Sequence, residues 1–130
     1  ILNRSDRLKV QVVRSDTEGI EMKFVPQNIA IILDNVVSNS TKYNANELRV
    51  LLGKDEKQYT IDFIDDGDGV SSDIADLNEL FEFGKGYTLT GTGVGLYHIK
   101  DIVEKDLQGT VTIESEPQKG FALHVRFGKV

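Results

Sequence analysis

The stretch GTGVGL, residues 91–96, places glycines at positions 91, 93 and 95, directly before a run with helical apolar spacing. Glycines at the start of a helix let backbone N–H groups approach a phosphate closely, and the positive end of the helix favours the anion. The stretch therefore predicts a phosphate-binding loop. A dinucleotide-binding fingerprint would need a strand immediately before the glycines and a parallel strand after the helix, and neither is predicted here.

The residues that follow predict a helix and then a β-hairpin. Apolar residues recur at helical spacing over 96–107, and we expect Gly109 to end that helix. Two runs rich in β-branched and apolar residues, 110–115 and 121–127, are separated by the turn sequence EPQKG. This arrangement is typical of two antiparallel strands.

The first half of the chain predicts strands around one long helix. Runs 8–14 and 20–25 are expected to form an opening hairpin, and runs 47–52 and 58–65 a second pair of strands. Between them, 26–43 has the apolar stripe of an amphipathic helix with a proline at its start. The stripe consists of Ile29, Ile32, Leu33, Val36, Val37 and Ser40.

The segment 68–90 has weak periodicity and contains LFEFGKG. A loop of this length in a compact domain is usually functional or disordered. Its leucines and phenylalanines either dock a mobile flap onto the body of the protein or belong to a helix and loop of the core.

Composition indicates a single soluble domain, which we assign to residues 1–130. The formal net charge is −6, cysteine is absent, and no apolar run approaches the roughly 20 residues of a membrane span. The negative charge, with no basic cluster, argues against a nucleic-acid partner. We expect an α+β fold in two layers, with a mixed, mostly antiparallel sheet of about five strands covered on one face by about three helices.

The sequence IDDGDGV ends a predicted strand with an inward carboxylate. Asp65 shares a strand face with Tyr59, Ile61 and Phe63 by the two-residue period, and Gly67 and Gly69 follow it. A buried carboxylate requires hydrogen-bond donors, because an unsatisfied one costs several kcal/mol. The alternatives are an Asx turn or a calcium-like turn, and the calcium version lacks the alternating oxygen ligands and distant glutamate that it would need.

A polar row follows one flank of the long predicted helix. Asn35, Asn39 and Lys42 stand at i, i+4 and i+7, so their side chains fall along one line. Two amides and an ammonium could serve phosphate oxygens and a metal ion. The alternative is an ordinary solvated helix face.

The order of these features resembles that of the Bergerat-fold ATPases, the superfamily of gyrase, heat-shock chaperones, mismatch-repair proteins and histidine kinases. The resemblance spans roughly residues 20–127. Within the superfamily, DNVVSNSTKYN is similar to the N box of sensor histidine kinases, DDGDG to the G1 box, LFEFGKG to the F box and GTGVGL to the G2 box.

The resemblance implies a site for Mg-ATP. Asn39 would coordinate Mg²⁺, with Asn35 supporting it and Lys42 contacting phosphate. Asp65 would accept a hydrogen bond from the adenine amine, Gly67 and Gly69 would let the base lie against the backbone, and Tyr43 would flank the nucleotide. Residues 70–90 would form a lid carrying Lys85. The residues expected around the phosphates are Gly91, Thr92, Gly93, Val94, Gly95 and Leu96.

The resemblance also distinguishes a kinase from a hydrolase. Hydrolysing relatives carry a glutamate at the position of Asn35, and an amide cannot act as a general base at neutral pH. Asp34 points about 100° away on the helix and is not expected to substitute. The expected reaction is therefore transfer of the γ-phosphoryl group to a histidine, with Asn35, Asn39 and Lys42 as the catalytic residues.

We expect the acceptor histidine to lie outside this chain. His98 and His124 both lack the acidic residue that usually follows the phosphorylated histidine. The implied partners are a dimerisation and phosphotransfer domain upstream and a response regulator downstream. We expect the isolated domain to be monomeric and cytoplasmic, from a homodimeric parent that is either soluble or anchored in a membrane.

Some residues depart from the family pattern. NSTKYN replaces the commoner small-residue pattern after the second asparagine, the F box is compressed, and the lid has GYTLT where many relatives carry another base. The alternatives are an ATPase of the same fold, or an ATP-sensing pseudokinase, that controls a dimer or partner without phosphotransfer.

Overall fold

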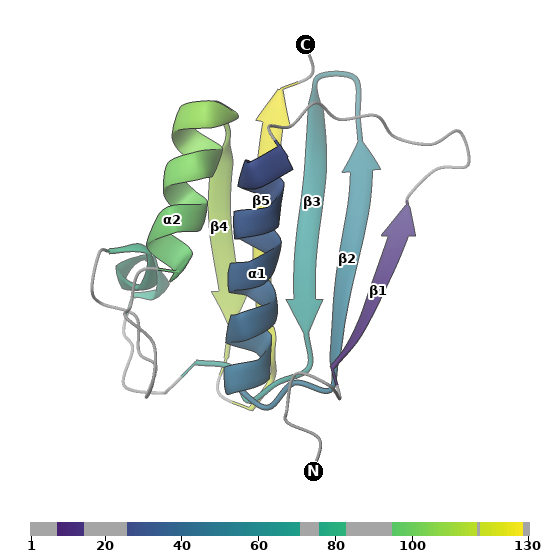
Figure 1. Ribbon diagram of the computed structural model, residues 1–130, viewed down its shortest axis with the longest axis vertical. Helices are drawn as coiled ribbons and strands as arrows, with labels where there is room; N and C mark the ends of the chain where they lie inside the picture. Colours follow the sequence, from purple (N-terminus) through teal and green to yellow (C-terminus); the bar gives the residue numbers. More distant parts are fainter. Residues whose placement is uncertain (1–7, 15–25, 71–75, 83–94, 117, 129–130) are drawn as a thin grey trace.

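The structure of the protein is a computed structural model that describes residues 8–14, 26–70, 76–82, 95–116 and 118–128. Helices α1 (Pro26–Lys42) and α2 (Gly95–Asp101) lie on one face of a single five-stranded sheet, as Figure 1 shows. The strands are β1 (Lys9–Arg14), β2 (Glu47–Lys54), β3 (Gln58–Asp65), β4 (Thr110–Ser115) and β5 (Phe121–Gly128). The predicted two-layer α+β architecture is confirmed.

The sheet has the order β1-β2-β3-β5-β4 and is mixed, as predicted. Strand β1 pairs with β2 in parallel, and the three remaining pairings are antiparallel. Strand β3 is central, with β2 on one side and β5 on the other. The second arm of the predicted opening hairpin, residues 20–25, lies outside the described residues; in the part that is described, β1 has β2 as its partner.

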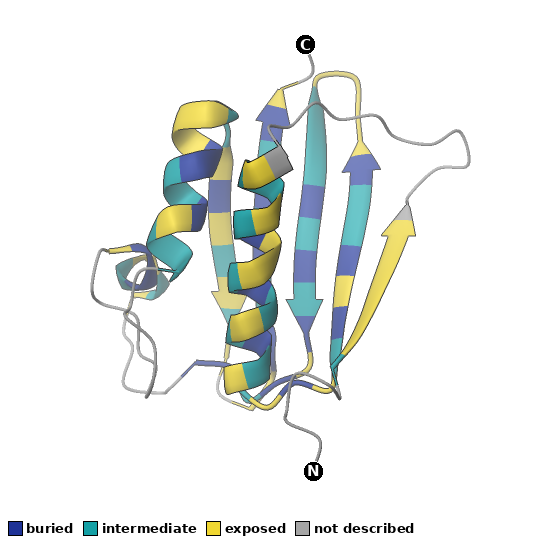
Figure 2. Ribbon diagram, in the orientation of Figure 1, coloured by how far each residue is buried: buried dark blue, intermediate teal, exposed yellow. Residues whose placement is uncertain are grey.

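The core fills the space between the sheet and the helices. Alternate residues of β3 and β5 are buried, so that one face of each strand meets α1 and α2 (Figure 2). Ile32 and Val36 come from α1, and Ile99 comes from α2. The prediction that Leu33 belongs to the buried stripe of α1 is wrong, because this residue is 37% exposed.

Helix α1 begins at Pro26 and ends in a reversal that leads directly into β2. Asn44 adopts a left-handed conformation with φ of 66°, which asparagine tolerates better than most residues. The backbone N–H of Ala45 donates to the carbonyl of Ser40 at 2.9 Å, which satisfies one of the open carbonyls at the helix end. The end of α1 is thereby fixed beside the end of β3.

Helix α2 continues into a π-helical turn, η3 (Ile102–Asp106), and the predicted helix over 96–107 is present in these two parts. The left-handed residue at its end is Gln108, with φ of 54°, and not Gly109. Glycine is required at 109 for a different reason. A Cβ there would collide with the carbonyl oxygen of Arg126 and approach Cβ of Phe127 to 2.8 Å.

Part of the long segment 68–90 is docked on the core. Residues 77–81 form a 3-10 helix, η2 (Leu77–Phe81), which Asp76 caps by accepting a hydrogen bond from the N–H of Asn78 at 3.0 Å. Leu80 and Phe81 are buried. For residues 77–81, the alternative that the segment belongs to a helix and loop of the core is therefore correct. Residues 71–75 and 83–90 lie outside the described residues.

The contact of Gly109 with β5 predicts a specific loss of stability. Gly109→Ala should lower the free energy of unfolding by about 1–3 kcal/mol, because the methyl group has no space beside the Arg126 carbonyl. Gly128→Ala is the control, since the nearest heavy atom to its added Cβ is the Lys57 carbonyl oxygen at 4.0 Å. Urea denaturation of both variants measures the difference, and equal midpoints would contradict the close contact.

Candidate functional site

The site is built around Asp65, the last residue of the central strand. Its register partners are Leu48 on β2 and Phe121 on β5, so it lies between two strands and under α1. It is 7% exposed, which confirms that the carboxylate points inward as the strand period predicted.

Groups of the protein donate hydrogen bonds to this carboxylate. The Ser40 hydroxyl donates to Oδ2 at 2.8 Å, and the backbone N–H of Gly67 donates to Oδ1 at 3.0 Å. Burial raises the pKa of Asp65 above its usual range, and the neighbouring charge of Asp66 adds to this. The hydrogen bonds from Gly67, Ser40 and the Phe121 backbone act in the opposite direction and lower the pKa. The carboxylate is thus largely removed from water, but it has hydrogen-bond donors from the protein.

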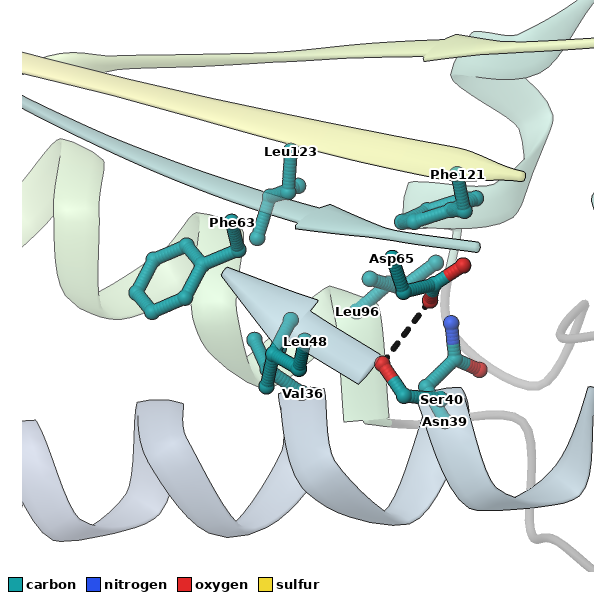
Figure 3. Close-up of a pocket in the computed structure, with 9 residues that line it drawn as sticks. All are labelled: Val36, Asn39, Ser40, Leu48, Phe63, Asp65, Leu96, Phe121 and Leu123. Atoms are coloured by element: carbon teal, nitrogen blue, oxygen red, sulfur yellow. Dashed lines mark hydrogen bonds between the residues drawn. The ribbon is translucent and has the colours of Figure 1, made fainter. Parts of the chain in front are cut away.

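An enclosed cavity of about 10 Å³ adjoins Asp65 (Figure 3). A cavity of this size holds one water molecule and is far too small for a purine. Its lining combines α1, the strands and the first turn of α2: Val36, Asn39, Ser40, Leu48, Phe63, Asp65, Leu96, Phe121 and Leu123. A base bound against Asp65 on this side would therefore require side chains such as Leu96 to move.

Asp65 also borders a wider, open depression on the side of the β4–β5 turn. Its volume is about 460 Å³, and its charged lining residues are Glu114, Glu116 and Lys119 besides Asp65 itself. Leu77 of η2 forms part of its wall. Asp65 therefore lies between a water-sized cavity under α1 and an open surface depression.

The residues of the polar row of α1 differ in their exposure to solvent. Asn35 and Asn39 are half-buried and Lys42 is exposed. The Asn35 amide nitrogen donates to the carbonyl of Ile31 at 2.9 Å, which fixes the side chain against its own helix. Asn39 and Asp65 line the same cavity, so two of the predicted groups are brought together.

The first residue of α2 packs against the same row. A Cβ placed on Gly95 would lie 3.0 Å from Oδ1 of Asn35, so glycine lets the start of α2 approach the long helix closely. The amide of Asn35 and the end of the GTGVGL stretch are therefore neighbours. Residues Lys85, Gly91, Thr92, Gly93 and Val94, which were predicted to contact the nucleotide, lie outside the described residues.

Gly67 and Gly69 are tightly packed against the protein's own backbone. A Cβ on Gly67 would lie 2.6 Å from the carbonyl oxygen of Tyr43. Gly69 has φ of 73°, and a Cβ there would collide with the carbonyl of Glu116. Packing accounts for both glycines without a ligand, in addition to the base contact predicted for them.

Tyr43 joins the end of α1 to the turn after β3. Its carbonyl accepts a hydrogen bond from the N–H of Asp68 at 2.7 Å, and burial raises the pKa of its phenol. Its position beside the glycine turn is compatible with the flanking role predicted from the resemblance.

Sequence reasoning missed Ser40 as a site residue. It was assigned to the buried stripe of α1, where its side chain is indeed buried, but no partner was assigned to its hydroxyl. A polar residue on a core-facing stripe needs a partner, and Asp65 was an inward acid in need of donors. The hydroxyl of Ser40 and the carboxylate of Asp65 were both expected inside the core, and each needed a hydrogen-bond partner. This shared need could have identified the pair from the sequence.

The two histidines have the surface or structural positions that were expected. His98 is exposed on α2. The His124 ring lies on the sheet face away from the helices, with Nδ1 2.6 Å from Oδ1 of Asp62, which also accepts from Arg126 at 2.8 Å. Neither histidine lines the Asp65 cavity, although Leu96 and Leu123, which lie close to them in the sequence, do.

Two features are absent from the described part of the chain. No cluster of three or more histidine or acidic side chains suited to holding a metal was found there. Among the helices of that part, none has the length and apolar character needed to cross a bilayer.

Comparison with known proteins gives consistent matches. Sensor protein kinase PilS of Pseudomonas aeruginosa is 27% identical over 133 aligned positions, covering 97% of this chain and 24% of the relative. Heme sensor protein HssS of Staphylococcus saprophyticus is 29% identical over 122 positions, covering 92% of this chain and 26% of the relative. The chain thus spans about a quarter of the length of these relatives.

Solved structures show the same fold. A nucleotide-free catalytic domain of histidine kinase ThkA superposes with a TM-score of 0.78 at 16% identity, covering 97% of this chain and 82% of that domain. A second crystal form gives a TM-score of 0.76. A family model described as histidine kinase-, DNA gyrase B-, and HSP90-like ATPase matches residues 24–129. The relatives that this chain resembles are named as a sensor protein kinase and a heme sensor protein, and the chain belongs to that ATPase family.

Proposed function

We propose that this domain binds Mg-ATP and transfers the γ-phosphoryl group to a histidine of a separate dimerisation and phosphotransfer domain. The observation that carries the proposal is the buried carboxylate of Asp65, held by Ser40 and Gly67 next to the half-buried amide of Asn39. An inward acid at the end of a central strand has a clear chemical use as an acceptor for a base amine.

Base recognition follows from the chemistry of the carboxylate. An ionised Asp65 has only acceptor sites, so it pairs with the exocyclic amine of adenine and opposes the carbonyl oxygen of guanine. The Ser40 hydroxyl and the Gly67 N–H each take one acceptor site and leave others for the amine. Residue 65 therefore selects adenine over guanine.

The side chains beside the cavity fit a Mg²⁺ ion that is bound mainly through the phosphates of the nucleotide. Mg²⁺ favours oxygen ligands and usually keeps several waters while it binds one or two protein oxygens plus substrate phosphates. Asn39 offers an amide oxygen from α1 beside the cavity, and Lys42 lies one turn further along the helix. When bound, the metal would neutralise charge on the phosphates; Asn39 would hold it and Lys42 would contact phosphate.

Asn35 favours phosphoryl transfer to a protein over hydrolysis. Its amide nitrogen donates to the helix backbone, and an amide lacks the basicity to deprotonate water. The nucleotide would then remain intact until a histidine imidazole is positioned in line with it. The acceptor would be supplied by a dimerisation and phosphotransfer domain of the same or a partner chain, and a response regulator would receive the phosphoryl group.

The first prediction concerns nucleotide choice. ATP should bind more tightly than GTP by about 1–3 kcal/mol, because guanine leaves the buried carboxylate facing an acceptor. Asp65→Asn should remove most of this difference, since an amide can donate to the guanine oxygen. Isothermal titration of both variants with both nucleotides measures the effect, and equal affinities for the wild type would refute the role of Asp65.

The second prediction concerns pH. Because burial raises the pKa of Asp65, its protonation should occur at a higher pH than for an ordinary aspartate. The protonated acid donates and no longer favours adenine, so the ratio of ATP to GTP affinity should be largest above the raised pKa and fall as the pH drops through it. The ratio cancels the titration of the phosphates themselves, and a ratio independent of pH would contradict the assignment.

The third prediction tests transfer. The isolated domain should show very slow steady-state ATP hydrolysis, whereas a longer protein that includes the phosphotransfer domain should become labelled by γ-labelled ATP. The label should be lost in acid, as phosphohistidine is. Asn39→Ala should abolish labelling through loss of the metal ligand. Rapid turnover by the domain alone, or an acid-stable product, would favour an ATPase that does not transfer phosphate to histidine.

A further inference from the structure

We propose that Ser40 is a positioning residue for base recognition, whose hydroxyl fixes the Asp65 carboxylate in the orientation and ionised state that accept the adenine amine. The inference rests on the proposed role of Asp65 and assigns a role to a residue that the site prediction did not include.

The two side chains form an isolated polar pair inside the core. Ser40 is 1% exposed and Asp65 is 7% exposed, and they are the buried polar side chains among the described residues. The bond of 2.8 Å joins α1 to the central strand across the helix–sheet interface (Figure 3). Ser40 also follows Asn39, which lines the same cavity, so the bond sets the carboxylate relative to the proposed metal ligand.

The surroundings of the carboxylate make this one bond important. The other residues lining the enclosed cavity, from α1, α2 and the strands, are uncharged. The neighbouring Asp66 and, across the open depression, Glu114 and Glu116 are acidic, and Lys119 there is paired with Glu116 at 3.2 Å. The hydrogen bonds from the Ser40 hydroxyl, the Gly67 N–H and the Phe121 backbone therefore offset desolvation of Asp65.

Loss of the Ser40 hydroxyl has a defined chemical consequence. Oδ2 would lose its donor in a buried site, so the neutral acid would be favoured and the pKa of Asp65 would rise further. A neutral carboxyl group carries a proton that opposes the adenine amine. Removal of a serine that served only as a link between helix and strand would also raise the pKa of Asp65, but it would leave nucleotide choice unchanged.

The chain offers a matched control on the same helix. The hydroxyl of Thr41 donates to the carbonyl of Val37 at 2.9 Å and does not reach the site. Thr41→Val removes that hydroxyl one residue away from Ser40 without touching Asp65. The comparison of Ser40→Ala with Thr41→Val therefore separates loss of the Asp65 bond from loss of a helix hydroxyl.

The experiment measures ATP and GTP affinity by calorimetry between pH 5 and 8, and follows the Asp65 carboxyl carbon by NMR titration without nucleotide. Ser40→Ala should weaken ATP binding by about tenfold near neutral pH with little change for GTP, which corresponds to loss of one hydrogen bond to a charged group. The Asp65 titration should move to higher pH. Thr41→Val should match the wild type in both measurements.

The outcomes separate the two hypotheses. A wild type that prefers ATP, combined with a Ser40→Ala variant of unchanged ATP affinity, overturns the inference whether or not the Asp65 titration moves, and leaves the proposed function intact. A wild type with no preference between ATP and GTP overturns the proposed function, and the inference with it. If Ser40→Ala does not fold, Ser40→Cys replaces it; its weaker donor should shift both measurements in the same direction by less, and wild-type values would overturn the inference.

Discussion

The fold and the candidate site both depend on satisfying one buried carboxylate. Asp65 ends the central strand under α1, where an unpaired charge would cost several kcal/mol. The hydrogen bonds from Ser40 and Gly67 tie a helix and a turn to that strand. Stability alone would be better served by an apolar residue at this position, since replacing a buried charge by a well-packed hydrophobic residue is often neutral or stabilising. The proposed function gives the acid a further role, as the acceptor of the adenine amine.

Much of the architecture could be predicted because the relevant signals are local. The two-residue period identified the buried faces of β3 and β5, and the spacing of Ile32 and Val36 identified the long helix. The ends of the helices and the exceptions to the periodic patterns depended on tertiary contacts, which no local sequence pattern contains. Leu33 is exposed, and the left-handed residue after η3 is Gln108, while Gly109 is required by the backbone of β5.

The site was predictable in its residue types but not in its internal bonds. The spacing of Asn35 and Asn39 and the inward direction of Asp65 followed from helical and strand periods. The pairing of Ser40 with Asp65 joins residues 25 positions apart on different elements, so it required the register of helix against sheet. The approach of Gly95 to Asn35 likewise depends on how α2 packs against α1.

The close backbone contacts of the glycine turn affect how such motifs are interpreted in related chains. Gly67, Gly69 and Gly120 each face a carbonyl oxygen of another segment, so selection for folding alone is sufficient to preserve them. A related chain without catalytic activity would retain these glycines for as long as it kept this fold. Divergence toward a regulatory protein without catalysis should consequently be sought first at Asn39 and Asp65, whose side chains line the cavity, and not at these glycines.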